Sequence, residues 1–576
     1  MRNLRNQLIC VLLLLASVSA FAAPFRPARA SAAMVASVHP EASRAGVEIM
    51  KAGGNAVDAS VAVGFALAVV HPQAGNLGGG GFLLVRFSDG REHFFDFREK
   101  APAAATRDMY LDQQGNVDPL ASRVGYRSIA VPGSVAGLVH AQKRFGKLTL
   151  AQVMAPAIRL AREGFVLTYE DAQSFRDEHL SKFPESRRIF QRNGRYYSQG
   201  DLFRQPELAR TLERIAANPD DFYKGAIARE LVAALRKGGS LITEADMASY
   251  EVKERAPIHG TYRGFQIISA PPPSSGGIAL VEALNVLEGY DLRKYGNRSA
   301  QATHLIAEAF RRAFFDRAEF LGDPDFSSIP VAQLIDKRYG GSWRESLNPD
   351  KASESATIRR PSAFSGLELN ASLRRAAAVG YESAETTHYS VVDAMGNAVA
   401  VTTTLNDSLG SRVTAEGLGF LLNDEMDDFA AKTGVPNMYG LIQGPANAVG
   451  PNKRPLSSMT PTIVLRPDGK LFLVLGSPGG SRIISTVANI LIGVVDFGLD
   501  IQEAVNAPRF HHQWMPDTLF VERGFSPDTL KLLREMGHKV EPQGYWSDGE
   551  CIAVDPKTGE RLGASDARNN GKALGY

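Results

Sequence analysis

The sequence has very little cysteine and no excess of charge of either sign. Of its 2 cysteines, Cys10 lies in an N-terminal segment that we expect to be removed, so Cys551 has no partner for an internal disulfide. The 64 Lys and Arg residues are balanced by 62 Asp and Glu residues, so no basic surplus is available to attract nucleic acid. We therefore expect no disulfide framework, no cysteine-rich metal site and no nucleic-acid partner.

Long apolar runs are also scarce, and the clearest one stands at the N-terminus. A positively charged start precedes the apolar stretch 8–18, which is shorter than the roughly 20 residues that a membrane-spanning helix needs. Ala20 and Ala22 then give the small-x-small pattern of a signal-peptidase site. The sequence predicts a signal peptide over 1–22 and a periplasmic or secreted protein with no membrane attachment. A retained anchor is the alternative.

Hydrophobic periodicity predicts a mixture of helices and antiparallel hairpins. The helices expected from a period near 3.6 are 41–51, 55–70, 150–163 and 300–321. The hairpins expected from alternating runs around glycine-containing turns are 82–87 with 92–97, 387–392 with 398–405, and 462–465 with 471–475.

The composition changes between about residues 351 and 385. This stretch is rich in Ala, Ser, Arg and Glu and has no large apolar anchors, which predicts an exposed, mobile linker. It ends abruptly at the strand expected from residue 387. A processing cut at this junction would leave Thr386 at the start of a new chain.

Thr386 opens the segment Thr-Thr-His-Tyr-Ser-Val-Val-Asp. A threonine hydroxyl is a weak nucleophile until a base takes its proton. At a chain terminus, the α-amine of Thr386 could be that base, because α-amines titrate near 7.7–8.0. From this segment alone, an ordinary strand start remains the alternative.

Three further groups carry polar chemistry. Arg98 follows an expected strand, and its planar guanidinium could hold a carboxylate through two hydrogen bonds, although a surface ion pair is the plainer interpretation. The segment 423–429 contains four acids within five positions, which is also typical of a solvated loop. Ser457 and Ser458 follow Leu456, and serines in loops usually bind backbone groups.

Glycines at 476–481 follow an expected strand and would let backbone N–H groups approach a ligand. A phosphate loop is the rival interpretation, but the lysine of G-x-x-x-x-G-K-[ST] is missing. The run 78–81 lacks dinucleotide-binding spacing, so we expect it to serve tight packing near the site. His511 and His512 are adjacent and have no accompanying acid–histidine motif, so we interpret them as structural.

Taken in order, these segments resemble the γ-glutamyltransferase family of N-terminal-nucleophile hydrolases from about Met34 to Tyr576. The segments that carry the resemblance are 76–82, 95–102, 271–277, 386–393, 423–429, 451–461 and 476–482. The resemblance implies a four-layer αββα sandwich built from two chains of one precursor. The large subunit would be 23–385 and the small subunit 386–576, together forming a heterodimer.

The resemblance also implies how the precursor is cut and how the enzyme reacts. The hydroxyl of Thr386 would attack the carbonyl of Glu385 during autoproteolysis, and later the carbonyl of a γ-glutamyl group. Thr404 would orient this nucleophile. The N–H groups of Gly479 and Gly480 would form the oxyanion hole.

Further roles concern the two ends of the glutamyl group. Arg98, Ser457 and Ser458 would bind its α-carboxylate. Glu425 and Asp428, assisted by Asn406, would bind its α-amino group. Some family members carry glutamine at the position of Glu425, and an acid there should still accept an ammonium. Tyr439 matches the tip of a lid loop that would cover the site.

The implied activity is transfer of a γ-glutamyl group from glutathione or related donors to water, an amino acid or a dipeptide, without cofactor or metal. Two alternatives stay open. A cephalosporin acylase of the same fold would remove glutaryl side chains, which lack the α-amino group. An uncleaved binding protein would hold glutamate-like ligands without turnover.

Overall fold

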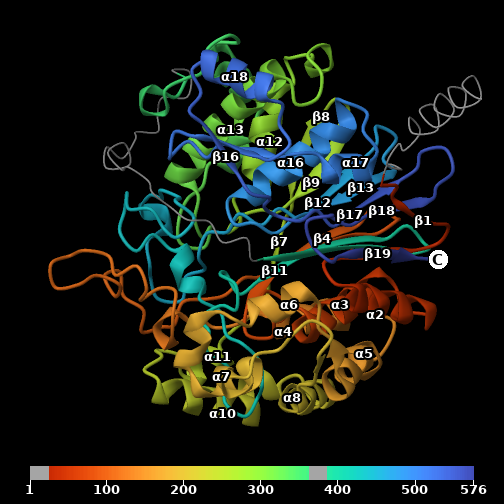
Figure 1. Cartoon of the computed structure of the whole chain (residues 1–576), viewed down its shortest axis with the longest axis vertical. Coiled ribbons are helices and arrows are strands. Elements are labelled where there is room, and N and C mark those ends of the chain that lie inside the picture. The colour runs from red at the N-terminus through yellow and green to blue at the C-terminus, as the bar shows by residue number, and fades with distance from the viewer. Residues whose placement is uncertain (1–24, 362–385) are drawn as a thin grey trace, which may run out of the picture.

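The computed structural model describes residues 25–361 and 386–576, which form a helix–sheet–sheet–helix arrangement (Figure 1). Two sheets of seven strands lie in the middle of the molecule, and helices cover both outer faces. The four-layer αββα sandwich expected from the sequence is confirmed. The predicted signal peptide and Glu385 lie outside the described residues.

The first sheet has the strand order β1-β18-β17-β13-β12-β9-β8. The bounds in that order are Ala28–Ala30, Arg561–Ala564, Cys551–Val554, Leu471–Leu475, Thr462–Leu465, Phe265–Ser269 and Ile258–Tyr262. The second sheet has the order β19-β2-β10-β11-β3-β4-β7. Its bounds are Lys572–Gly575, Met34–Ser37, Thr387–Val392, Ala398–Thr404, Gly80–Arg86, Glu92–Phe97 and Lys253–Arg255.

Strand β10 has the central position that matters for the site. It pairs antiparallel with β11 on one side and β2 on the other. It also contacts α3 (Ala56–Val70) below and strands of the other sheet above, so all six of its residues are buried. Thr386 immediately precedes this strand and is therefore held in the interior, where only 6% of its surface is exposed.

Separate sets of helices cover the two sheets (Figure 1). The outer layer beside β10 and β11 includes α2 (Pro40–Lys51), α3, α4 (Ser134–Phe145), α5 (Leu150–Glu163), α8 (Pro206–Ala217) and α10 (Ala226–Lys237). The opposite layer includes α12 (Gly276–Leu287), α13 (Ala300–Phe320), α16 (Arg482–Val495), α17 (Ile501–Asn506) and α18 (Pro527–Glu535). Helix α3 is apolar all round, as its complete burial requires, and Asn55 and Asp58 form its N-terminal capping box.

Shorter elements complete the described chain. The remaining α-helices are α6 (Tyr169–Ser174), α7 (Pro184–Gln191), α9 (Asp221–Lys224), α11 (Glu244–Ala248), α14 (Val331–Leu334) and α15 (Lys337–Glu345). The two small sheets contain β14 (Phe510–His511), β15 (Leu519–Glu522) and β16 (Val540–Gln543), and β5 (Phe165–Val166) with β6 (Leu202–Phe203). The helices and hairpins expected from periodicity are confirmed, with ends shifted by at most two residues.

The expected linker is described over residues 351–361, which are partly exposed. Five of these residues are exposed, whereas Ser355 and Ile358 are buried. Arg360 pairs with Asp316 at 2.5 Å and with Glu319 at 2.8 Å, both on α13. Burial of Ile358 and the ion pairs of Arg360 therefore fasten the end of this stretch to the core, and the mobility of the linker stays a prediction.

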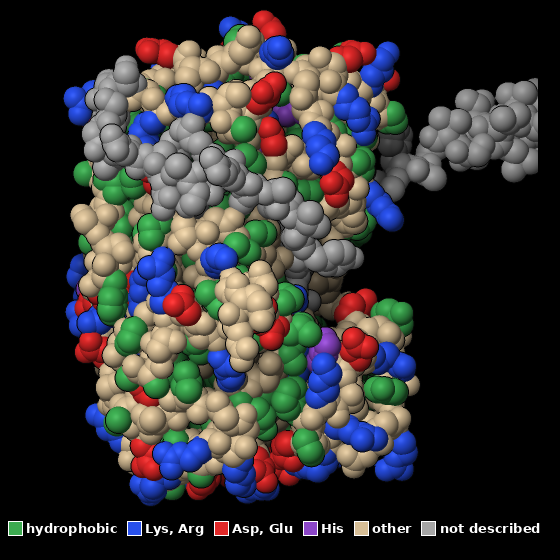
Figure 2. All heavy atoms as spheres, turned by 90° about the vertical axis from the view of Figure 1, so that its left-hand side faces the viewer, with side chains coloured by type: hydrophobic (Ala, Val, Ile, Leu, Met, Phe, Trp, Pro, Cys, Tyr) green, Lys and Arg blue, Asp and Glu red, His purple; other side chains and the backbone are tan. Residues whose placement is uncertain are grey.

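Figure 2 shows Lys and Arg side chains interspersed with Asp and Glu over one face, in keeping with the balanced composition. Cys551 is buried and unpaired. Across residues 25–361 and 386–576, no helix combines the length and apolar character needed to cross a membrane.

Candidate active site

Thr386 and Thr404 are the centre of the site. The last residues of β11 lie beside the first residues of β10, and this register brings the two hydroxyl oxygens to 3.3 Å. The backbone N–H of Asn406 donates to the Thr404 hydroxyl at 2.8 Å. Thr404 is therefore held in place from behind and faces Thr386.

The glycine run before β3 supports Thr404 by tight packing, as expected from the sequence. The Asn76 side chain donates to the backbone carbonyl of Thr404 at 2.9 Å and accepts from the N–H of Gly79 at 2.9 Å. A side chain at position 79 would collide with the same Thr404 carbonyl. The run thus fixes the end of β11 and contributes no side-chain chemistry of its own.

The second glycine loop joins β13 to α16. Gly479 and Gly480 have φ angles of 124° and 54°, which residues with a side chain rarely adopt. A Cβ at Gly480 would lie 2.5 Å from the ring of Tyr439, and one at Gly479 would collide with the hydroxyl of Ser547. Gly480 lines the same pocket as Thr386, whereas Gly479 is not among its lining residues.

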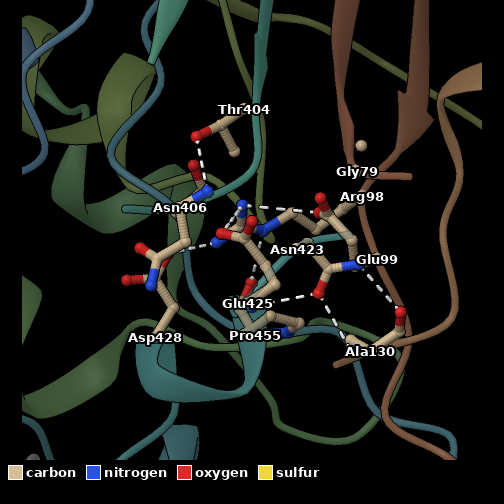
Figure 3. Close-up of polar contacts among 12 residues, drawn as sticks. Gly79, Arg98, Glu99, Ala130, Thr404, Asn406, Asn423, Glu425, Asp428 and Pro455 are labelled. Atoms are coloured by element: carbon tan, nitrogen blue, oxygen red, sulfur yellow. Dashed lines mark hydrogen bonds and ion pairs between the residues drawn. The ribbon is translucent and has the colours of Figure 1, made fainter. Parts of the chain in front are cut away.

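Arg98 lies at the far end of that pocket from Thr404, and is buried. Its guanidinium donates to the carboxylates of Glu425 and Asp428, and lies 3.6 Å from Glu99. Figure 3 shows Arg98 among these acids, with Asn406 and Thr404 nearby. Burial alone would lower the pKa of Arg98, but the surrounding carboxylates outweigh it and the net pKa is raised. Arg98 is therefore charged and oriented before any ligand binds.

The acidic segment is not a solvated loop. Residues Glu425–Asp428 form the short 3-10 helix η9, and Glu425 is fully buried. Burial raises the pKa of Glu425 well above its ordinary value, and raises that of Glu99 to about 7, against the opposing effect of Arg98. One guanidinium among three carboxyl groups leaves the cluster short of positive charge. An entering ammonium group would supply it.

Ser457 and Ser458 form another wall of the pocket. The hydroxyl of Ser457 accepts from the N–H of Met459 at 3.1 Å. The hydroxyl of Ser458 accepts from Arg317 at 3.1 Å, and Arg317 also donates to Ser275 at 3.0 Å. Both serines face the site expected for a carboxylate.

Arg317 was missed by the sequence analysis. It lies near the end of α13, is 2% exposed, and has one guanidinium nitrogen without a hydrogen-bond partner among the described residues. Burial lowers its pKa to about 10, only partly offset by Asp428. A buried arginine on an apolar helix gives no sequence signal that distinguishes it from its neighbours Arg311 and Arg312, which pair with Glu308.

Tyr439 closes the pocket. Its hydroxyl donates to the side-chain oxygen of Asn406 at 2.8 Å, and its backbone carbonyl accepts from Gln513 at 3.0 Å. Asn406 adopts a left-handed φ of 80°, which turns its side chain toward Tyr439 and Asp424. Tyr439 therefore lines the pocket and is bonded to Asn406, and its role as a lid stays a prediction.

We call this cavity the Thr386 pocket. Its lining brings together Thr386, Thr404, Asn406, Arg98, Glu425, Asp428, Ser457, Ser458, Gly480, Tyr439 and Arg317. Its free volume is about 20 Å³, roughly room for one water molecule. In this conformation the acids bind Arg98 directly, so an entering ligand must replace those ion pairs with its own charges.

The adjacent histidines His511 and His512 both contact protein groups. His511 contacts Ser485 at 2.9 Å and Gln513 at 2.8 Å, and His512 lies 3.3 Å from Asp517. A separate buried group comprises His304, Glu308 and His538. There the two rings bond each other at 2.8 Å, and Glu308 is occupied by Arg311 and Arg312. These contacts use the atoms that would otherwise ligate a metal.

Comparisons with known proteins agree with this site. A family model described as Gamma-glutamyltranspeptidase matches residues 42–576. The glutathione hydrolase proenzyme of Escherichia coli (strain K12) is 52% identical over 549 residues, which cover 95% of this chain and 92% of that protein. The acylase ACY 1 proenzyme of Pseudomonas sp. (strain SE83) is 37% identical over 565 residues, covering 96% and 95%.

Solved structures share the fold. A cephalosporin acylase from Bacillus halodurans superposes with a TM-score of 0.81 at 26% identity, covering 97% of this chain and 98% of that chain. A chain of the Helicobacter pylori gamma-glutamyltranspeptidase superposes with a TM-score of 0.56 at 43% identity, covering 58% and 96%. These similarities confirm the N-terminal-nucleophile hydrolase fold. The chain belongs to the γ-glutamyltranspeptidase family.

Proposed function

We propose that this chain is an autoprocessing γ-glutamyltransferase and glutathione hydrolase with Thr386 as its nucleophile. The observation that carries the proposal is the Thr386 pocket, where a threonine hydroxyl shares one small cavity with a buried arginine and a group of acids. The relative that is 52% identical is named a glutathione hydrolase proenzyme, and hydrolysis of glutathione agrees with this chemistry.

Processing comes first in this proposal. The Thr386 hydroxyl attacks the carbonyl of Glu385, the peptide becomes an ester, and water releases the subunits 23–385 and 386–576. The freed α-amine of Thr386 then serves as the base. Residues 1–22 are removed as a signal peptide, which places the enzyme in the periplasm or outside the cell.

Acyl transfer uses the same hydroxyl. Its oxygen attacks the γ-carbonyl of the donor as the α-amine of Thr386 takes its proton. The N–H groups of Gly479 and Gly480 stabilise the oxyanion, an effect commonly worth about 3 kcal/mol for one donor. The amine product leaves with the proton, and the γ-glutamyl ester on Thr386 passes to water, an amino acid or a dipeptide.

Charge complementarity explains why the donor must carry a free α-carboxylate and a free α-ammonium group. The α-carboxylate of the donor replaces an acid beside Arg98 and bonds Ser457 and Ser458. Its α-ammonium takes the place that Arg98 leaves beside Glu425 and Asp428, assisted by Asn406. A zwitterion can therefore substitute for both partners of the existing ion pairs, so no buried charge is left uncompensated.

A comparison of donors tests the proposal against its closest alternative. Hydrolysis of glutaryl cephalosporins is a second candidate, because some of the similar proteins bear acylase names. A glutaryl group lacks the ammonium and would leave Glu425 and Asp428 unmatched. We expect glutathione to be turned over with a higher kcat/KM than a glutaryl amide; the reverse ranking would favour the acylase.

A further inference from the structure

Arg317 is a buried arginine with no carboxylate partner in the part of the chain that the structure describes. It is 2% exposed and lines the Thr386 pocket. Its guanidinium bonds two neutral hydroxyl groups, donating from Nε to Ser275 at 3.0 Å and from Nη2 to Ser458 at 3.1 Å. The third nitrogen, Nη1, has no hydrogen-bond partner among the described residues.

Two neighbouring arginines on α13 differ from Arg317 in this respect. Arg311 and Arg312 pair with the two carboxylate oxygens of Glu308, at 3.0 and 2.7 Å. Asp428 attracts Arg317 without forming an ion pair, because its carboxylate binds Arg98. Burial lowers the pKa of Arg317 to about 10, so its guanidinium stays protonated at neutral pH. A buried and unpaired positive charge favours the binding of an anion beside it.

The wall of the pocket beside Arg317 presents hydrogen-bond donors. The hydroxyl of Ser458 accepts from Arg317, and the hydroxyl of Ser457 accepts from the N–H of Met459 at 3.1 Å. Each hydroxyl therefore keeps its own hydrogen to donate. Two O–H donors beside an unpaired positive charge suit a carboxylate, which can accept through both of its oxygens.

Ser275 connects Arg317 to the same wall by a second route. Its hydroxyl accepts from Arg317 and donates to the backbone carbonyl of Ser457 at 2.7 Å. Its backbone N–H donates to the same carbonyl at 2.8 Å. Arg317 therefore fixes the positions of both pocket serines, Ser458 directly and Ser457 through Ser275.

We propose that Arg317 makes the Thr386 pocket specific for donors with a free α-carboxylate. Its charge, held behind Ser458, is balanced when that carboxylate binds Ser457 and Ser458. Arg98 differs, because it already has carboxylate partners of its own. Arg317 acts through the serines and is a positioning residue, with no part in making or breaking bonds. This inference rests on the proposed function and adds a second cation to its carboxylate site.

Inhibition of L-γ-glutamyl-p-nitroanilide hydrolysis by two small amides tests the inference. Glutaramate keeps the carboxylate of the glutamyl group and lacks its ammonium, whereas 4-aminobutanamide keeps the ammonium and lacks the carboxylate. For Arg317→Met, we expect the donor KM and the Ki of glutaramate to rise about 10-fold, the lower end for hydrogen bonds to charged groups. The Ki of 4-aminobutanamide should change less than about 3-fold. A purely structural role would raise both Ki values alike.

Arg298→Met is the matched control. Arg298 also has one guanidinium nitrogen without a partner among the described residues, and its other contacts are to Pro508 and Asn297. It does not line the Thr386 pocket. The donor KM and both Ki values should therefore stay unchanged in this variant.

Equal changes in the two Ki values of Arg317→Met, or an unchanged Ki of glutaramate, would overturn the inference. Should that variant fail to fold or to be processed, Ser275→Ala provides a second test, because it removes the route to Ser457. The Ki of glutaramate should then rise about 3-fold and that of 4-aminobutanamide should not; any other result would count against the inference. Absence of p-nitroaniline release by the unmodified protein would instead refute the proposed function itself.

Discussion

The two cavities beside Thr386 differ in the kind of interaction that they offer. The Thr386 pocket has about 20 Å³ of free volume and is built from buried ions that already bind one another. A second cavity, of about 240 Å³, is lined by Thr386 together with His39, Gln73 and Ser547, and these last three side chains each have one polar atom without a hydrogen-bond partner among the described residues. Loss of one partner of a buried ion pair strongly destabilises a protein, because the other charge is left buried and unpaired. A single neutral hydrogen bond contributes only about 1 kcal/mol to the free energy of folding.

This difference suggests a division of labour. Paired charges accept only a ligand that replaces both signs at once, which suits an invariant glutamyl head. Neutral groups around a larger volume impose no such requirement of charge. Variants on the charged side should therefore have larger effects than variants on the neutral side.

The largest effect is expected for Arg98→Ala. It removes the cation that binds the α-carboxylate and leaves Glu99, Glu425 and Asp428 facing one another. Breaking a buried ion pair costs about 3–5 kcal/mol, so kcat/KM for the γ-glutamyl donor should fall about a thousandfold. Arg263→Ala is the control, since Arg263 pairs with Asp496 at 3.0 Å away from the Thr386 pocket. Equal losses in the two variants would contradict the assignment.

Asp428→Asn should sharpen the comparison between donors. It keeps the size of the side chain and removes the charge that faces the α-ammonium. We expect kcat/KM for γ-glutamyl-p-nitroanilide to fall about 30-fold, within the range for charged hydrogen bonds, and that for the glutaryl analogue to fall less than 3-fold. Equal decreases in kcat/KM for both donors would show that Asp428 does not bind the amino group.

Arg317→Ala should have a smaller effect, because Arg317 positions Ser458 from behind. We expect a rise of about 10-fold in donor KM with a smaller change in kcat. Arg317→Lys should restore only part of the affinity, since one ammonium cannot reproduce both of its serine contacts. A change confined to kcat would argue against a role in carboxylate binding.

The last effect concerns stability and not activity, and should appear as a dependence of stability on pH. Burial lowers the pKa of His71, which lines the second cavity, and of His388 in β10 to about 3. A histidine whose pKa is lowered by folding stabilises the fold at pH values above its unfolded pKa of 6.5. This contribution is lost as the pH falls below 6.5, because the unfolded chain then binds a proton that the folded chain does not. Each should cost about 2 kcal/mol by pH 5. Thermal unfolding at pH 7 and pH 5 measures it; equal Tm values would contradict it.

Much of the fold was predictable, because its hairpins and long helices are local patterns. The register of β10 and β11 explains why Thr386 and Thr404 could be paired in advance. Several features depended on contacts between distant segments. Arg98 reaches Glu425 across 327 positions of sequence, and no spacing rule shows that the acids bind Arg98 before a ligand does.

The same reason explains the other omissions. Arg317 matters because α13 carries it to Ser458, and the second cavity exists because three remote segments meet beside Thr386. Composition predicted an exposed segment from 351, but burial of Ile358 and pairing of Arg360 with Asp316 fasten its start to α13. Tertiary packing decides which charges are buried, and local composition does not contain that information.

The central claim is that Thr386 becomes a chain terminus and acts as the nucleophile. The most direct measurement is the intact mass of the purified protein under denaturing conditions, beside a Thr386→Ala variant. We predict two fragments that meet between Glu385 and Thr386, with the variant left as one uncut and inactive chain. A single uncut chain in both preparations, or cleavage that persists in the variant, would contradict the claim.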